Sequence, residues 1–433
     1  MKNWERKKLG EVCIVERGSS PRPIVKYQTD SPDGVNWIKI GDTKGVDKYI
    51  FSTKEKITKE GAEKSRYVKE GDFILSNSMS FGKPYIMKTD GYIHDGWFVF
   101  RLPDYLDKDY FYYLLTSPNV QEQIQSLGAG AIVKNISGDL VKKVDITFPK
   151  SLPEQQRIVS ILDEAFAAIA KAKANAEQNL KNAKELFESY LQGVFEKKGD
   201  GWEKKKLGEV IEYDKNQNIH KGLPYVGLEH IESNSGRFIG SIEPQVVKSS
   251  TFYFNDHHVL YGRLRPYLNK VLLPDFEGHC STEIFPIKVG NQITREFLFY
   301  WLIAGSTVKK IDATWTGARM PRANMNQVLE FDFAFPTLKE QQTIVRQLDA
   351  LRAETQKLEA VYQKKIADLE ELKKSILQLA LSPVEGKAFA GELKVSELGF
   401  DGSQDDRINE YEKEEILQSK NPINPNSDKK LKV

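Results

Sequence analysis

The sequence predicts an α+β protein with two globular modules, each followed by a long helix, the two helices pairing as an antiparallel coiled coil with pseudo-two-fold symmetry. Three observations lead to this fold: an internal repeat, two helix-period seams of apolar residues, and strand-rich segments broken by glycine and proline. At 433 residues the chain also exceeds the size at which one core keeps growing. We therefore expect at least two domains.

The repeat is visible at two places in the chain. Residues 4–12, which end in Leu-Gly-Glu-Val, recur as residues 202–210, and residues 152–159, which contain Glu-Gln-Gln, recur as residues 338–345. The first spacing, 198 residues, exceeds the second, 186 residues, by 12, so the first module is longer by that amount. Two matches in the same order indicate a duplication.

Each Glu-Gln-Gln string starts a predicted helix. In residues 158–194 apolar or small side chains recur at steps of four and three, which predicts a helix of roughly 40 residues, about 60 Å long, with one narrow seam. Residues 344–380 repeat this register with a break at Lys373, where Leu372 can take over the seam.

The middle of the seam differs between the copies. Ala172 and Ala176 of the first helix stand where the second has Leu358 and Tyr362. If the helices pair midpoint on midpoint, small residues meet large ones, as close packing requires. The alternative is two separate helices that dimerise with other chains.

The domains expected from this pattern alternate modules and helices. Short β-type runs punctuated by Gly, Pro and Asp predict strand-rich modules with some helix. The expected order is a first module (1–150), a central helix (151–198), a second module (199–336), a C-terminal helix (337–381) and a polar tail (382–433).

Composition argues for a cytoplasmic protein. No apolar run approaches a membrane span, and no apolar stretch follows the charged start as it would in a signal peptide. Cys13 and Cys280 have no metal-like spacing, which favours two reduced thiols. The net charge of +2 is low for a nucleic-acid binder and is compatible with local basic patches or basic partners.

At this point the sequence resembles the specificity (S) subunit of type I restriction–modification systems, the HsdS family. The resemblance covers the chain to about residue 395. It rests on the Trp-x-x-x-x-Leu-Gly-x-Val openings at Trp4 and Trp202 and on the Pro-x-x-Leu-x-Glu-Gln string at Pro149, which recurs with one residue fewer at Pro336. Residues 225–231, 264–270 and 316–322 add further matches in the same order.

This resemblance implies a non-catalytic DNA-binding subunit. Each module would be a target recognition domain that reads one half of a bipartite, asymmetric site in double-stranded DNA. The helices would act as spacer and as docking surface for two methyltransferase subunits, joined by restriction/translocase subunits. S-adenosylmethionine, ATP and magnesium would be carried by those partners, and no cofactor by this chain.

Candidate DNA contacts are clearest in the second module. Residues 262–270 alternate cations with apolar positions near a turn, and residues 316–322 place two cations after a glycine that permits close backbone approach. The alternative is a solvated loop whose arginines pair with nearby glutamates. The candidates are Arg263, Arg265, Tyr267, Lys270, Arg319 and Arg322.

The first module offers more polar counterparts. Residues 76–83 stand where the second module has its arginine-rich string, and they could read bases or simply form a turn. A loop at residues 17–22 fits a phosphate contact, and residues 134–135 correspond in position to the region of Arg322. The candidates are Arg17, Ser20, Arg22, Asn77, Ser78, Lys83, Lys134 and Asn135.

Motifs for chemistry are sparse. The Asp/Asn-Pro-Pro-aromatic motif of amino-methyltransferases and the phosphate-binding loop of ATPases are absent from the sequence, and scattered histidines form no metal-ligand quartet. We therefore expect no catalytic and no metal site. Asp33, Asp42 and Lys44 match a short nuclease-like pattern, so a stand-alone nuclease is one rival hypothesis. A coiled-coil adaptor without DNA affinity is the other.

Overall fold

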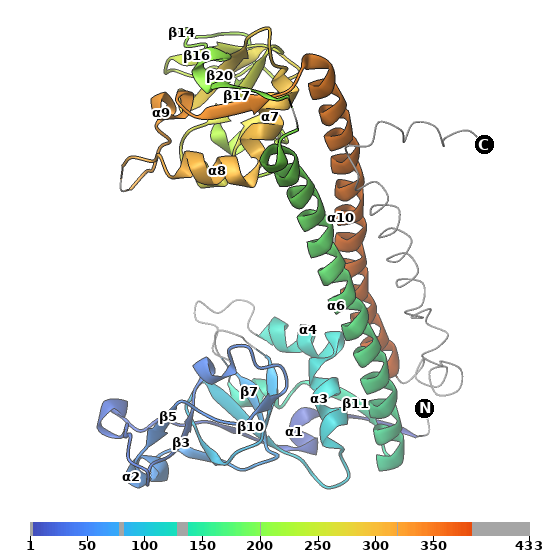
Figure 1. The fold of residues 1–433 in the computed structure, drawn as a ribbon. Helices are drawn as coiled ribbons and strands as arrows, with labels where there is room; N and C mark the ends of the chain where they lie inside the picture. The colour runs from blue at the N-terminus through green and yellow to red at the C-terminus, as the bar shows by residue number, and fades with distance from the viewer. Residues whose placement is uncertain (1–2, 78–81, 128–136, 200, 318, 383–433) are drawn as a thin grey trace, which may run out of the picture. The chain divides into compact units, whose positions relative to one another are not determined.

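The computed structural model describes residues 3–77, 82–127, 137–199, 201–317 and 319–382 (Figure 1). The chain divides into two compact units. Unit 1 comprises the chain up to Asn175 together with the part that begins at Lys365, and unit 2 comprises Ala176–Lys364. Both units mix helices and sheets, which confirms the predicted α+β class.

Unit 1 contains two larger sheets and a two-stranded one. The five-stranded sheet has the order β2-β10-β7-β8-β4, the four-stranded sheet the order β5-β3-β9-β6, and β1 pairs with β11. The strands are β1 (Trp4–Lys8), β2 (Ile14–Arg17), β3 (Val35–Ile38), β4 (Tyr49–Ile50), β5 (Glu55–Ile57), β6 (Arg66–Val68), β7 (Phe73–Ser76), β8 (Pro84–Met87), β9 (Gly91–Ile93), β10 (Trp97–Arg101) and β11 (Asp145–Pro149).

Helix α3 packs on the five-stranded sheet of unit 1, whereas α2 packs beside the four-stranded sheet. Phe111 of α3 packs edge-on against Phe73 of β7, so α3 lies on the five-stranded sheet in the main core of the unit. The short helices are α1 (Leu9–Val12), η1 (Ile24–Lys26), η2 (Ile40–Thr43), α2 (Lys59–Glu63), α3 (Lys108–Thr116), α4 (Pro118–Leu127) and α5 (Gly138–Val141).

Unit 2 repeats this plan with one strand fewer in its first sheet. Its sheets have the orders β13-β20-β17-β18 and β14-β16-β19-β15, and β12 pairs with β21. The strands are β12 (Glu203–Lys206), β13 (Ile211–Tyr213), β14 (Gln217–Asn218), β15 (Tyr225–Val226), β16 (Thr251–Phe254), β17 (His258–Gly262), β18 (Val271–Leu272), β19 (Gly278–Cys280), β20 (Ile284–Val289) and β21 (Asp332–Phe335). The short helices are η3 (Leu207–Glu209), η4 (Leu228–His230), η5 (Pro266–Leu268), α7 (Arg295–Ile303), α8 (Gly305–Asp312) and α9 (Met325–Leu329).

The two units share the core of their strand topology, although unit 1 adds β4 to its first sheet and the outer strands β5 and β14 pair at opposite ends of the second. The central strand is β10 in unit 1 and β20 in unit 2. Strand β10 lies between β2 and β7, the first strand of the β7–β8 hairpin, and β20 lies between β13 and β17, the first strand of the β17–β18 hairpin. In each unit a parallel pair, β3 with β9 or β15 with β19, belongs to the second sheet. The loop β9–β10 therefore corresponds to β19–β20, and the hairpin loop β7–β8 to β17–β18.

Two long helices, α6 (Leu152–Lys197) and α10 (Leu338–Ala380), each contribute one part to unit 1 and one part to unit 2. In unit 1 Lys173 forms an ion pair with Glu370, and Lys373 Nζ lies 5.1 Å from the ring centre of Phe166. Because the α10 residue number falls as the α6 number rises, the pairing is antiparallel, as predicted. In unit 2 Tyr190 donates to Gln347 Oε1 at 3.5 Å.

Burial follows the predicted seam. Lys373 is exposed and Leu372 half-buried, which confirms the expected break in the second helix. Ala176 and Tyr362 are buried, whereas Ala172 and Leu358 are half-buried. Which of these four residues meet, and the two-fold symmetry itself, stay predictions.

The Glu-Gln-Gln repeat has a structural role in each unit. Gln341 is fully buried; its Nε2 donates to Gln292 O (2.9 Å) and Pro336 O (2.8 Å), and its Oε1 accepts from Thr294 N at 2.9 Å. Gln155 has the corresponding bonds in unit 1. Each glutamine therefore fastens the start of a long helix to the strand before it and to the N-terminus of α3 or α7.

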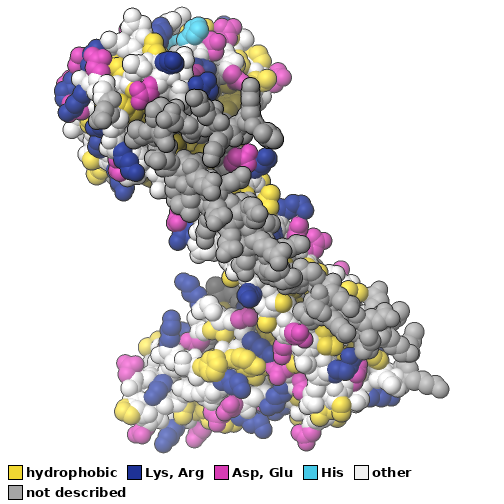
Figure 2. Space-filling view, turned by 45° about the vertical axis from the view of Figure 1, so that its right-hand side comes forward, with side chains coloured by type: hydrophobic (Ala, Val, Ile, Leu, Met, Phe, Trp, Pro, Cys, Tyr) yellow, Lys and Arg dark blue, Asp and Glu magenta, His cyan; other side chains and the backbone are white. Residues whose placement is uncertain are grey.

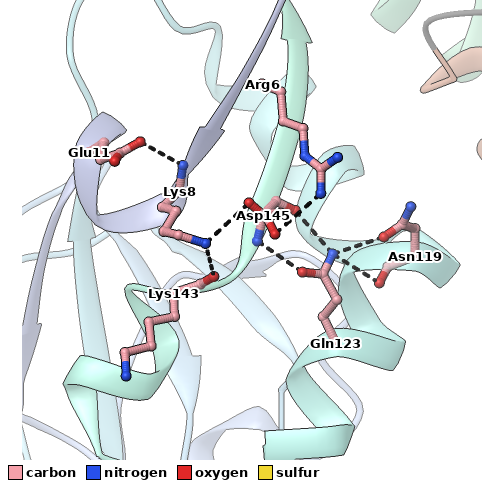
Figure 3. Close-up of polar contacts among 7 residues, drawn as sticks. All are labelled: Arg6, Lys8, Glu11, Asn119, Gln123, Lys143 and Asp145. Carbon is pink, nitrogen blue, oxygen red and sulfur yellow. Dashed lines mark hydrogen bonds and ion pairs between the residues drawn. The ribbon is translucent and has the colours of Figure 1, made fainter.

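The strand openings form a second anchor. In unit 1 Asp145 of β11 binds Arg6 and Lys8 of β1, each at 3.4 Å, and Gln123 of α4 bonds both backbone groups of Asp145 (Figure 3). Glu11 accepts from Lys8 N at 2.9 Å and caps the next short helix.

The same anchor recurs in unit 2. Asp332 of β21 binds Lys204 at 2.8 Å and Lys206 at 2.9 Å, and Glu209 caps η3 by accepting from Lys206 N. Leu207, like its counterpart Leu9, is fully buried. The repeated sequence strings are thus the parts that hold each module to its helix.

Candidate nucleic-acid interface

In unit 2 the structure brings together the two candidate strings, which lie more than 40 residues apart in the sequence. Arg265 N donates to Pro321 O at 2.7 Å, and Ala323 N donates to Arg263 O at 2.9 Å. Thr316 and Arg322 exchange two backbone hydrogen bonds of 3.0 and 3.1 Å, which closes the second string on itself. Residues 263–265 therefore lie beside residues 316–317 and 319–323 in one backbone patch.

Local backbone geometry shapes this patch. Gly317 has φ +94°, a conformation in which a side chain would be strained, so the turn needs a glycine. Arg265 (φ +52°) and Asn269 (φ +45°) are left-handed on either side of η5. Asparagine tolerates this region, but arginine adopts it rarely, at a cost on the order of 1–3 kcal/mol, and such outliers cluster at functional sites.

Four exposed side chains line this patch, and we call them the basic–aromatic surface: Arg265, Tyr267, Trp315 and Arg319. Tyr267 is 52% exposed and Trp315 51% exposed. Neither Arg265 nor Arg319 has a hydrogen-bond or ion-pair partner for its side chain among the residues that the structure describes. Guanidinium groups bind phosphates and base edges, and exposed aromatic rings contact bases or sugars. Trp315 was missed by the sequence analysis, although it directly precedes the Thr-Gly string.

The other two arginines of the two strings, Arg263 and Arg322, pair with Glu283, which lies in the β19–β20 loop. Arg322 Nη2 lies 2.9 Å from Glu283 Oε1, and Arg263 Nε donates to Glu283 Oε2 at 3.1 Å. Burial alone would raise the pKa of Glu283, but hydrogen bonding and charge from Arg322 and Arg263 bring this pKa below its ordinary value. Both arginines thus pair with a nearby glutamate, as the alternative reading of the sequence expected, and their contact with DNA stays a prediction.

Lys270 has an internal role in this module. Its Nζ donates to Leu228 O at 2.6 Å and to Ile231 O at 2.7 Å. These bonds occupy the ammonium group in fastening the η4 turn to the hairpin. Contact of Lys270 with DNA stays a prediction.

In unit 1 the corresponding hairpin loop contains Asn77 and Lys83, two of the predicted residues. Asn77 is fully buried, and its backbone N donates to Gly96 O at 2.8 Å. Lys83 Nζ donates to Val46 O at 3.0 Å and lies 5.1 Å from the ring centre of Tyr85. Both side chains thus have structural contacts, and their contact with DNA stays a prediction. Ser78, Lys134 and Asn135 lie outside the described residues.

Three residues of the predicted loop at residues 17–22 contact Asp95, which lies in the β9–β10 loop. Ser20 donates to Asp95 Oδ1 at 2.6 Å, Arg22 lies 3.4 Å from Oδ2, and Arg17 Nε donates to the backbone O at 3.1 Å. A Cβ at Gly18 would lie 2.0 Å from His94 O, so this approach requires glycine. The hydrogen bond from Ser20, opposed by burial and aided by nearby cations, lowers the pKa of Asp95. Arg22 remains 81% exposed.

The chain is similar to known proteins in both sequence and fold. A family model described as the type I restriction modification DNA specificity domain matches residues 1–181 and again residues 199–368. The chain belongs to this family. The two matched stretches correspond to the two modules with parts of their helices, so the specificity domain occurs twice, in agreement with the internal repeat.

Curated relatives of this specificity-domain chain carry related names. It is 26% identical to the type I restriction enzyme EcoDI specificity subunit of Escherichia coli over 74% of this chain and 77% of that one. It is 22% identical to the MjaIX specificity subunit of Methanocaldococcus jannaschii over 92% and 95%.

Two solved structures show the same fold. One is a chain from a study of complex assembly and conformational transition of the type I R-M system (TM-score 0.74, 17% identity, 88% of this chain and 98% of that one). The other is the HsdS subunit from Thermoanaerobacter tengcongensis (TM-score 0.55, 19% identity, 88% and 96%).

The nuclease, metal-site and membrane hypotheses can each be compared with the described structure of this specificity-domain chain. The nuclease-like Asp42 has a capping role, since its carboxylate accepts from Lys39 N at 2.8 Å and Lys54 N at 3.2 Å. Among the described residues no group of three or more His, Cys, Asp and Glu is arranged to hold a metal ion. No helix in the described part of the chain has the length and apolarity to cross a membrane.

Proposed function

We propose that this chain is the sequence-specific DNA-binding subunit of a type I restriction–modification enzyme and is itself non-catalytic. Membership of the DNA specificity family supports the assignment. The observation that carries it is the basic–aromatic surface, where Arg265 and Arg319 are exposed beside Tyr267 and Trp315. Because the two modules share the core of one topology but differ in their loops, the target would be bipartite and asymmetric.

The surface charge is consistent with local binding. Lys and Arg alternate with Asp and Glu over the face shown in Figure 2, in keeping with 63 basic against 61 acidic residues in the chain. Phosphate contacts would therefore come from short loops and not from a uniformly basic face.

The partners follow from the same assignment. Two methyltransferase subunits would dock on the long helices, and restriction subunits would join them in the cytoplasm. S-adenosylmethionine, ATP and magnesium would bind to those subunits. Co-purification of the full chain with the methyltransferase subunit is the direct test of the scaffolding role.

DNA binding is tested with the full chain, alone and with its methyltransferase subunit, on random duplex DNA over a range of salt concentrations. Arg265→Ala and Arg319→Ala should each weaken binding and reduce the salt slope by about 0.9 per lost phosphate contact. Arg346→Ala, an exposed arginine on α10, is the matched control and should leave DNA binding unchanged.

The outcomes separate the hypotheses. No salt-dependent binding in either setting, with the methyltransferase complex intact, would favour a coiled-coil adaptor. Magnesium-dependent cleavage by the chain alone, lost in Asp42→Ala, would establish the nuclease. Equal effects of Arg346→Ala and Arg265→Ala would place the DNA elsewhere.

A further inference from the structure

The arginines of unit 2 differ in how many of their donors are occupied. Arg322 uses Nε and Nη2 on Glu283, and its Nη1 donates to Met320 O at 3.3 Å. Arg263 uses only Nε, which donates to Glu283 Oε2 at 3.1 Å. Among the described residues, Nη1 and Nη2 of Arg263 have no hydrogen-bond partner, and the side chain is about a third exposed.

The orientation of Arg263 is fixed on three sides. Its backbone N donates to Glu283 O at 2.9 Å, and its Nε is held by the carboxylate of the same residue. Its Cζ lies 5.2 Å from the ring centre of Phe285, so the planar guanidinium is supported by an aromatic ring. An arginine held at Nε, with free Nη groups, can present two donors in a fixed plane.

We propose that Arg263 reads a guanine in the half-site bound by unit 2 and that Glu283 is the positioning residue that aims it. Two coplanar donors match O6 and N7 on the major-groove edge of guanine. A carboxylate beside the arginine also repels phosphate oxygens, so the pair favours a base edge over the DNA backbone. This inference rests on the proposed function and deepens it.

An acidic residue also lies in the corresponding loop of unit 1. Asp95 lies in the β9–β10 loop of unit 1, which corresponds to the β19–β20 loop that carries Glu283. Asp95 also holds residues of a candidate DNA loop, although that loop follows β2 and has a different sequence. Both modules thus carry an acidic residue in this loop, at neighbouring and not identical positions, and it holds different groups in each.

The test is selection from a randomised duplex library by the full chain bound to its methyltransferase subunits. The wild type should select a bipartite target with guanine at a position of one half-site. Arg263→Ala and Glu283→Gln should both weaken that single preference, by about 10- to 100-fold for the loss of a bidentate contact, and leave the other half-site unchanged. Glu283→Asp, which keeps the charge, should retain part of it.

Two controls separate base reading from a structural role. Arg319→Ala should weaken binding to all sequences alike, because a phosphate contact carries no sequence information. Arg322→Gln removes the other partner of Glu283 and should relax the same position more weakly, which provides a second variant if Glu283→Gln does not fold. Unfolding temperatures of all variants are measured alongside.

Each result bears on a different statement. A uniform loss of affinity in Arg263→Ala, with every base preference kept, would make Arg263 a phosphate contact and overturn the inference. A relaxed position in Arg263→Ala that is unchanged in both Glu283→Gln and Arg322→Gln would overturn the positioning role. If the wild-type complex selects no sequence, the proposed function itself fails.

Discussion

Gln341 allows a quantitative test of how the module is fastened to its helix. The side chain is fully buried and makes three hydrogen bonds, to Gln292 O, Pro336 O and Thr294 N, at 2.8 to 2.9 Å. Gln341→Leu keeps a similar volume but leaves these three backbone groups without their partner. At about 1 kcal/mol for each bond, the free energy of unfolding of unit 2 should fall by about 3 kcal/mol.

The adjacent Gln342 provides the matched control, because it is exposed. Gln342→Leu makes the same chemical change one residue later and should alter the unfolding free energy by less than about 0.5 kcal/mol. The assay is hydrogen exchange of peptides from α7 and from the start of α10, which reports local opening separately from unit 1. Equal protection of these peptides in the two variants would refute the reasoning.

Three further changes can be measured. Ala176→Tyr should overpack the buried seam by about 1–3 kcal/mol, whereas Ala174→Tyr, at an exposed position, should be tolerated; equal thermal unfolding of the two would show that the helices do not pack at Ala176. Hydrogen bonds from Lys204 and Lys206 lower the pKa of Asp332 to about 2, so its stabilising effect should be present above about pH 4 and be lost as the pH falls towards 2. In acid unfolding, Asp332→Asn should remove this part of the pH dependence, and an unchanged acid profile would contradict it. Burial raises the pKa of Cys13 to about 12 and also raises that of Cys280, so a thiol reagent at pH 8 should label neither in the native protein and both in denaturant.

Much of the fold could be predicted from the sequence because it depends on local patterns. The apolar seam of α6 and α10 follows a helical period, and the exposed Lys373 with half-buried Leu372 was anticipated from that period alone. The repeated strings were also visible as self-similarity. Their roles were not visible, because the partners of Gln155 and Gln341 include backbone groups almost 50 residues away.

The candidate site was predicted only in outline. The two arginine strings of unit 2 were identified, but Arg263, Arg265, Lys270 and Arg322 were all treated as equivalent cations. The structure separates them, since Glu283 holds two of them and backbone carbonyls hold Lys270. Nothing in the local sequence around Glu283 indicates this, because Arg322 lies 39 residues away.

The sequence by itself determined the duplication, the long helices and the segments that could meet DNA, since periodicity and repeated strings are properties of neighbouring residues. Only the tertiary structure decided which cations are free. A cation is neutralised by whichever carboxylate or carbonyl the strand topology places beside it, and the β19–β20 and β9–β10 loops place Glu283 and Asp95 there. The four arginines of the two strings in unit 2 therefore divide into two pairs. Arg265 and Arg319 are exposed, and Arg263 and Arg322 are held in place by Glu283.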